Sequence, residues 1–278
     1  MVEVSENTVT ELEVGKIFNM AENVVPSPQF QFERTKILGF PIDRVTLDQT
    51  RNVLAEYIEC SEVESLHPTK LVLTADSNAF VSARTDPVYQ RLFREASLIT
   101  PDSAGPVWAL SRIGKPVPGR VSGVDLVEEL CKLSEVTGAR IYFLGAAPGV
   151  ALSASKILKD KYPAMVIAGV RDGFFGSQSD QEVAEKIAET NPQILIVAMG
   201  MPRQELFILD TAHIIGAKVG IGVGGSLDVH SGTVKRAPTW IQRLKLEWAW
   251  RFILNPRKIA KVKNLPIFYW LVRFQNSK

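Results

Sequence analysis

Residues 194–205 read Ile-Leu-Ile-Val-Ala-Met-Gly-Met-Pro-Arg-Gln-Glu. The first six residues are an apolar run with the length of a buried strand, and Pro202 follows where a helix would begin. The same succession, a short apolar run and then an amphipathic stretch, recurs along the chain. Repeated strand-to-helix units of this kind are typical of a parallel sheet that helices cover on both faces.

The periodicity predicts an α/β fold with a Rossmann-like, mainly parallel sheet between about residues 35 and 235. Buried strands are expected at 71–74, 98–100, 141–144, 165–170, 194–199 and 218–223. Helices are expected at 124–137, 151–162, 181–190 and 203–215. Residues 1–34 show no sustained periodicity and predict a mobile extension. Residues 236–278 predict a helical C-terminal appendage.

The C-terminal appendage differs from the rest of the chain in charge. Residues 236–278 hold ten Lys or Arg and one acid, a net charge of +9, whereas the remainder carries −7. Four of the five tryptophans also lie there: Trp240, Trp248, Trp250 and Trp270. A basic, aromatic segment on an acidic body predicts an anionic partner, either lipid headgroups or nucleic acid.

Several classes of protein are disfavoured by composition. Cys60 and Cys131 stand far apart and predict reduced thiols in a cytoplasmic protein. The acidic N-terminus does not resemble a secretory signal, and no apolar run has the length needed to cross a bilayer. The three histidines form no metal-binding pattern, so neither a metal nor a cofactor is expected.

Ligands of such sheets bind beyond the carboxyl ends of the strands. Polar and glycine residues crowd after each predicted strand, at 76–78, 101–103, 145–149, 171–173, 200–205 and 224–228. Gln204 and Glu205 are expected to point into this crevice as hydrogen-bonding groups. Each position alone is more often structural, but six polar loops at one sheet edge predict a binding site.

Two charged residues at this edge suggest chemistry. Asp102 follows a predicted strand and could take a proton from a hydroxyl nucleophile. Pro-Asp-Ser before an apolar helix is typical of a helix N-cap, however, and composition alone favours the cap. Arg120 opens a helix after a Pro-rich turn. Its guanidinium could clamp a diphosphate or form an ordinary ion pair with a surface acid.

Two glycine-rich stretches leave alternatives open. Residues 220–225, Gly-Ile-Gly-Val-Gly-Gly, match the GxGxxG pattern of dinucleotide-binding proteins. Their glycines fall partly inside a strand, residues 226–232 look like loop, and no acid follows on a next strand, so a close backbone approach to another ligand is favoured over NAD. Residues 145–149 fit both a phosphate-binding turn and a plain strand-to-helix turn.

Taken together, the chain resembles the WecG/TagA/CpsF family of glycosyltransferases from about Thr35 to Pro256. The similarity rests on eight segments in the same order: Leu-Thr-Ala-Asp-Ser, Thr-Pro-Asp-Ser, Arg-Val-Ser-Gly-Val-Asp-Leu, Phe-Leu-Gly, Gly-Met-Pro-Arg-Gln-Glu, Gly-Val-Gly-Gly-Ser-Leu-Asp, Arg-Ala-Pro and Leu-Glu-Trp-Ala-Trp-Arg. Members transfer a sugar, often N-acetylmannosamine or its uronic acid, from a UDP donor to a polyprenyl-diphosphate-linked acceptor.

The resemblance implies Asp102 as the catalytic base in a pocket shared with Thr74, Arg120 and Gln204. It also implies that Asp228 holds donor groups and that Arg251 reaches the donor diphosphate, with Lys258 and Lys261 among further basic residues of the appendage. The chain departs from the family at two places that line this pocket. Thr74-Ala75-Asp76 with Asn78 replaces Thr-x-Asn, and Ser103 replaces a glycine.

The residues themselves favour a compatible mechanism. The sequence contains no Asp-x-Asp pair, so a leaving diphosphate would be neutralised by arginines and backbone N–H groups. One carboxylate acting as base in a direct displacement would invert the anomeric carbon. The aromatic, basic tail suits contact with the inner face of the cell membrane, and the sequence leaves a homo-oligomer open. The rival hypotheses are an NAD(P)-dependent oxidoreductase and a nucleic-acid-binding protein.

Overall fold

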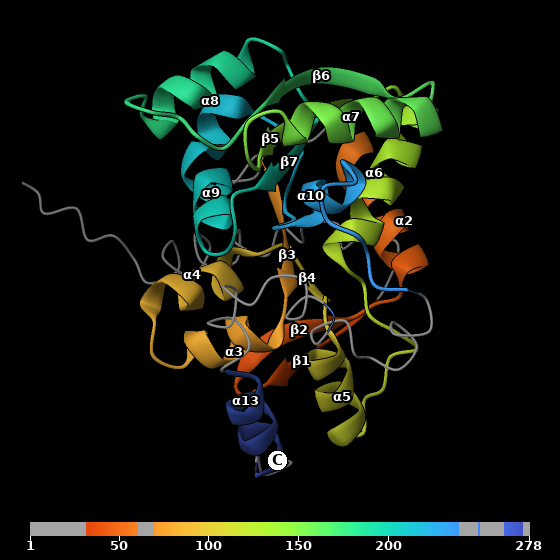
Figure 1. Cartoon of the computed structure of the whole chain (residues 1–278). Coiled ribbons are helices and arrows are strands. Elements are labelled where there is room, and N and C mark those ends of the chain that lie inside the picture. The colour runs from red at the N-terminus through yellow and green to blue at the C-terminus, as the bar shows by residue number, and fades with distance from the viewer. Residues whose placement is uncertain (1–31, 61–68, 239–249, 251–263, 275–278) are drawn as a thin grey trace, which may run out of the picture. The chain divides into compact units, whose positions relative to one another are not determined.

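The computed structural model describes residues 32–60, 69–238, 250 and 264–274, all within the compact unit Phe32–Lys278 (Figure 1). Its helices are α2 (Leu47–Glu59), α3 (Ser77–Ala83), α4 (Pro87–Glu95), α5 (Ala104–Arg112), α6 (Gly123–Thr137), α7 (Val150–Lys161), α8 (Asp180–Ala188), α9 (Arg203–Ile215), α10 (Ser226–His230) and α13 (Asn264–Arg273). Its strands are β1 (Glu33–Ile37), β2 (Phe40–Arg44), β3 (Lys70–Ala75), β4 (Leu98–Pro101), β5 (Arg140–Gly145), β6 (Val166–Arg171), β7 (Ile194–Ala198) and β8 (Val219–Gly222).

The main sheet has six strands in the order β4-β3-β8-β7-β5-β6, and every neighbouring pair is parallel. This arrangement confirms the predicted Rossmann-like α/β class. The hairpin of β1 and β2 forms a separate antiparallel pair, which the sequence did not predict. β1 begins at Glu33, two residues before the expected start of the catalytic domain at residue 35.

Helices cover both faces of the sheet because side chains alternate along each buried strand. Leu71 and Leu73 of β3 pack in one apolar cluster with α3, α4, α8 and α9, whereas Val72 packs in a second cluster with α2, α6, α7 and α10. All three side chains are fully buried. In Figure 1 the two sets of helices lie to the left and right of the sheet.

All the predicted strands and helices are present, and most of their ends differ from the predicted ones by one or two residues. α9 has the predicted bounds, and Pro202 precedes it as expected. Residues 226–232 were expected to form loop, but Ser226–His230 form the short helix α10. A helix of five residues is too short to leave a periodic pattern in the sequence, which explains the error.

The last described helix, α13, packs on α3 and α5. The Phe268 ring is fully buried and lies 6.0 Å from the Phe80 ring, between centroids, and Tyr269 lies 4.6 Å from Trp108. Within the described residues, no helix has the length and apolar character required to cross a membrane. The rest of the appendage, apart from residues 236–238, 250 and 274, lies outside the described residues, as do residues 1–31 of the predicted N-terminal extension.

Candidate functional site

The candidate site lies at the carboxyl ends of β3, β4, β7 and β8. β3 leads into α3 on one face of the sheet, while its neighbour β8 leads into α10 on the other. Adjacent strands whose connections leave to opposite faces open a crevice between them, which is where open α/β sheets bind ligands. Most of the predicted site residues follow these strands.

Asp102 follows β4 and is held from both sides. Its backbone N–H donates to the Ala75 carbonyl at 3.1 Å, and its Oδ1 accepts the N–H of Gly123 at 3.2 Å. Ser103, not Asp102, is the N-cap of α5. The half-buried carboxylate therefore lies at the first turn of α6, where the helix dipole favours a negative charge.

Gln204 joins the loops that follow β7 and β8. Its Oε1 accepts the N–H groups of Gly200 at 3.0 Å and Gly224 at 2.9 Å, and its Nε2 donates to Glu205 Oε1 at 2.6 Å. Both side chains are buried. A Cβ on Gly222 would stand 2.2 Å from Glu205 Oε1 and 2.5 Å from Gln204 Nε2. The glycine in β8 is therefore required for these two side chains to fit, which gives a packing reason for part of the glycine-rich stretch.

The residues at and just after the end of β3 have three different hydrogen-bonding roles. The buried Thr74 hydroxyl donates to the Gly222 carbonyl at 2.9 Å and so joins the ends of β3 and β8. The Asp76 carboxylate caps α3 by accepting the Ala79 N–H at 2.9 Å. Asn78 Oδ1 accepts a hydrogen bond from Asn264 in α13 at 2.6 Å.

The side chains of Asp76 and Glu205 both influence Tyr89. Burial raises the pKa of Tyr89, and the negative charges of these two carboxylates raise it further. One acid at the start of α3 and another in the first turn of α9 therefore both affect the pKa of Tyr89. Among the described residues, no three His, Cys, Asp or Glu side chains group as metal ligands.

A cleft opens beside the first turn of α6. It is lined by Arg120, Ser122, Val124, Val229, Val234, Lys235, Arg236, Ala237 and Trp250. Lys235, Arg236 and Trp250 were not among the site residues predicted from the sequence. The Arg-Ala-Pro motif at 236–238 was the available signal, but it did not indicate which residues face Arg120.

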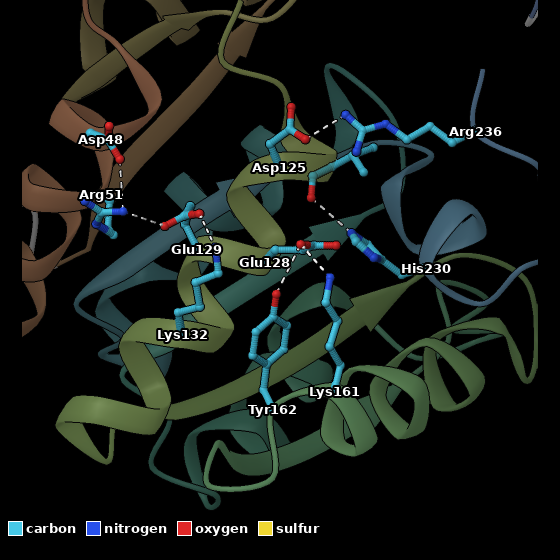
Figure 2. Close-up of polar contacts among 11 residues, drawn as sticks. Asp48, Arg51, Asp125, Glu128, Glu129, Lys132, Lys161, Tyr162, His230 and Arg236 are labelled. Carbon is cyan, nitrogen blue, oxygen red and sulfur yellow. Dashed lines mark hydrogen bonds and ion pairs between the residues drawn. The ribbon is translucent and has the colours of Figure 1, made fainter. Parts of the chain in front are cut away.

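The cleft wall is fixed by charged contacts. The Arg236 guanidinium pairs with Asp125 Oδ1 at 2.6 Å, and Ser122 Oγ donates to Asp125 Oδ2 at 2.6 Å. Figure 2 shows Asp125 on α6 facing Arg236. The Asp228 carbonyl accepts the Val234 N–H at 2.9 Å and so fixes the segment that leads to Lys235.

A second polar cluster joins α6, α7 and α10 (Figure 2). The ring Nε2 of His230 lies 3.0 Å from the Val124 carbonyl, so the neutral ring donates its N–H there. Burial lowers the pKa of His230. Burial alone would raise the pKa of Glu128, but hydrogen bonds from Lys161 and Tyr162 outweigh it and lower that pKa.

The structure brings most of the predicted site residues to one edge. Thr74, Gln204 and Glu205 gather around Gly222. Asp102 and Arg120 border the start of α6, and a Cβ on Gly123 would lie 3.3 Å from Val223 Cα, so the two groups adjoin. Asp228 follows in α10, and Asp76 and Asn78 lie at the start of α3. Arg251, Lys258 and Lys261 lie outside the described residues.

The chain is similar to a described protein family and to several bacterial enzymes. A family model described as "Glycosyl transferase WecG/TagA/CpsF family" matches residues 35–278. An N-acetylglucosaminyldiphosphoundecaprenol N-acetyl-beta-D-mannosaminyltransferase of Bacillus spizizenii is 35% identical over 79% of this chain and 86% of its own length. Proteins of the same name from Staphylococcus aureus strain MRSA252 and Bacillus subtilis strain 168 are 30% and 35% identical. These alignments cover 86% and 70% of this chain, and 92% and 76% of the respective relatives.

Proposed function

This chain belongs to the WecG/TagA/CpsF family of glycosyltransferases, and from that premise we propose that it transfers an N-acetylmannosamine-type sugar from a UDP-sugar to a polyprenyl-diphosphate-linked acceptor. The names of the similar bacterial enzymes support the sugar and the acceptor. The observation that carries the mechanism is the Asp102 carboxylate, held at the carboxyl end of β4 by the N–H of Gly123. The product would be a lipid-linked intermediate of a bacterial surface polysaccharide.

Asp102 is proposed to act as the general base. It takes the proton from the acceptor hydroxyl as that oxygen attacks the anomeric carbon of the donor sugar. The bond from the anomeric carbon to the UDP oxygen breaks in the same step, and UDP leaves with the electron pair. A single displacement of this kind inverts the anomeric configuration. A fixed carboxylate in a crevice is suited to this role because general-base catalysis depends first on position.

The donor is proposed to bind in the crevice between β3 and β8. Thr74, Gln204 and Glu205 surround Gly222 at this edge, and Asp228 follows β8. Gln204 is proposed to support donor binding by holding in place the loops after β7 and β8, which would enclose the donor. Asp76 contributes a further carboxylate at the start of α3, whereas Asn78 is proposed to act through its hydrogen bond to the appendage.

The leaving diphosphate is proposed to be neutralised without a metal ion. Guanidinium groups bind phosphate oxygens through several N–H groups at once, which suits them to a charge that grows during bond breaking. Arg120 beside α6 and Arg251 in the appendage are the proposed groups. Transfer activity that survives EDTA would support this, and loss restored by Mg²⁺ or Mn²⁺ would contradict it.

The appendage is proposed to bring the enzyme to the inner face of the cell membrane. Ile267 and Trp270 on α13 and Phe274 just after it expose 47%, 62% and 64% of their surface. Their spacing of three and four residues puts Ile267 and Trp270 on one side of α13, with Phe274 continuing that side, while Phe268 faces the core. Exposed aromatic rings on a basic segment are suited to the headgroup region of an anionic membrane.

The defining experiment is a transfer assay with a soluble prenyl-diphosphate-linked N-acetylglucosamine as acceptor. UDP-N-acetylmannosamine, UDP-N-acetylglucosamine and UDP-glucose are compared as donors, and product is followed by mass. Transfer from the first donor in preference to the others supports the proposal. Failure of all three, in a protein that binds none of them by thermal shift, would contradict it.

A further inference from the structure

Arg34 and Asp43 form an ion pair across the hairpin of β1 and β2. The two residues are partners in the register of the hairpin, and the guanidinium donates two hydrogen bonds, from Nε to Oδ1 at 2.6 Å and from Nη2 to Oδ2 at 2.8 Å. Asp43 is fully buried, whereas 42% of the Arg34 side chain is exposed. The carboxylate is therefore held in one geometry, because an unpaired charge in the interior would be costly.

This ion pair binds the outer edge of β4. β4 is the last strand of the main sheet, and no strand among the described residues pairs with its outer edge. Asp43 Oδ2 accepts the backbone N–H of Ile99 at 2.8 Å, and Arg34 Nη2 donates to the Ser97 carbonyl at 3.0 Å. The two side chains thus satisfy backbone groups of alternate residues, which a neighbouring strand would otherwise do.

The contacts on β4 lie close to the proposed base in the chain. Ile99 is three residues before Asp102, and the strand ends at the residue between them, Pro101. The Asp102 N–H donates to the carbonyl of Ala75 at the end of β3. The position of the Asp102 backbone therefore depends on how β4 lies against β3.

The hydrogen-bond partner of the base is attached to the same strand. Thr100 Oγ1 donates to the Val121 carbonyl at 3.3 Å, and the Val121 N–H donates to the Pro101 carbonyl at 2.9 Å. Val121 lies two residues before Gly123, whose N–H binds the Asp102 carboxylate. A shift of β4 would therefore move both the base and the group that orients it.

We propose that Arg34 and Asp43 are positioning residues, which fix β4 and thereby hold Asp102 where it can take the acceptor proton; this inference rests on the proposed function. A base must lie within hydrogen-bonding distance of the hydroxyl, and a displacement of about 1 Å can slow such a step about a hundredfold. Glu33 and Arg44 form a second pair in the same hairpin, but both side chains are partly exposed, and such pairs contribute little.

The test compares variants of the full-length protein by steady-state transfer kinetics. Asp43→Ala removes every contact of the carboxylate. Asp43→Asn retains one oxygen, which can accept both the Ile99 N–H and a guanidinium N–H, as Oδ2 does in the wild type. Arg34→Lys keeps the charge beside Asp43 without the forked donor geometry, and it carries the test if Asp43→Ala does not fold. Asp210→Asn, which breaks an ion pair between α4 and α9, is the control.

Asp43→Ala is expected to lower kcat about tenfold to a hundredfold and to change the KM for the UDP-sugar less than about twofold. Arg34→Lys should show a smaller loss of kcat, and Asp43→Asn and Asp210→Asn should retain most of it. In an Asp102→Asn background, Asp43→Ala should lower kcat no further, because residues that act as a unit are not additive. A wild-type kcat in folded Asp43→Ala or in Arg34→Lys, or an equal loss with and without the Asp102 carboxylate, would overturn the assignment.

Amide hydrogen exchange separates this inference from the proposed function. Asp43→Ala should speed exchange at the N–H groups of Asp102, Val121 and Gly123, while those of β5 and β7 stay protected. If the wild type transfers no sugar but these N–H groups exchange faster in the variant, the proposed function is wrong and the placement of residue 102 by Asp43 stands. If the wild type transfers sugar and Asp43→Ala keeps its kcat and exchange rates, the proposed function stands and the positioning role is wrong.

Discussion

The side-chain amide of Asn264 donates a hydrogen bond to Asn78 Oδ1 at 2.6 Å and so ties α13 to α3. The two residues are 186 positions apart in the chain. α3 starts directly after β3, at the edge that carries Thr74 and Asp76. The C-terminal helix is therefore attached to an element of the candidate site, and not to a remote surface.

Phe268 is expected to hold α13 in place. Replacing a buried Phe by Ala typically costs about 3–5 kcal/mol, but a terminal helix can separate locally at a smaller cost. Phe268→Ala should therefore speed amide hydrogen exchange throughout α13 while β3 and β7 stay protected. Phe274→Ala, at the exposed position directly after the same helix, is the control and should exchange as the wild type does. Unchanged exchange in Phe268→Ala would show that other contacts dock the helix.

The exposed side of α13 should determine membrane binding. The Trp270 and Phe274 rings lie 5.4 Å apart between centroids and are both mostly exposed. The double variant Trp270→Ser, Phe274→Ser should bind anionic vesicles several-fold more weakly in co-sedimentation, because it loses the interfacial aromatic area. Val136→Ser, at an exposed apolar position of α6, serves as the control. Equal binding of the double variant and the wild type would exclude α13 as the contact.

Gln204 should matter for stability as well as for the donor. Gln204→Ala leaves the N–H groups of Gly200 and Gly224 without their acceptor, and one such group costs about 1–3 kcal/mol. We expect the free energy of unfolding to fall by about 2 kcal/mol or more, and the KM for the donor to rise. Gln181→Ala on the exposed part of α8 should change neither. A Gln204→Ala variant with wild-type stability would show that the hydrogen bonds of Gln204 to the two loops do not stabilise the protein.

His230 should make the protein less stable in mild acid. Burial lowers the pKa of the folded-state ring, so the unfolded chain binds a proton more readily. The resulting loss of stability begins as the pH falls below the ordinary histidine pKa of about 6.5 and continues down to the folded-state value. One proton gives a slope of at most about 1.4 kcal/mol per pH unit.

His230→Gln keeps an N–H donor for the Val124 carbonyl but cannot titrate. Its unfolding free energy, measured in urea between pH 7.5 and 5, should fall less steeply than that of the wild type. His213→Gln, at an exposed position of α9, should retain the wild-type slope. Identical slopes in all three proteins would contradict a role for His230.

The sequence predicted the repeating part of the fold better than the site. Apolar runs such as 194–199 are local signals. They are easy to recognise in the sequence because a strand that is buried on both faces is apolar throughout. The tie between Thr74 and Gly222 joins residues 148 apart, and the cleft brings Arg120 to Lys235 and Trp250. Such pairings depend on strand order and on the path of the chain after β8, which periodicity does not encode.

Asp102 illustrates the same limit. Pro-Asp-Ser before a helix fits an N-cap, and the local pattern favoured that role. In the structure Ser103 is the N-cap of α5, and the Asp102 carboxylate bonds instead to Gly123, 21 residues away. Only the parallel packing of β4 against β3, with the Val121 N–H bonded to the Pro101 carbonyl, brings the start of α6 to this carboxylate.

The most direct test of the proposed mechanism is the turnover of Asp102→Asn. The amide oxygen can still accept the Gly123 N–H, so the fold and UDP binding should be retained, whereas the amide cannot take a proton. With saturating donor and soluble acceptor, kcat should fall by roughly 10²–10⁴-fold. Asp160→Asn, on the exposed side of α7, should retain wild-type kcat. A folded Asp102→Asn protein that binds UDP and turns over at a near-normal rate would contradict the assignment of Asp102 as the base.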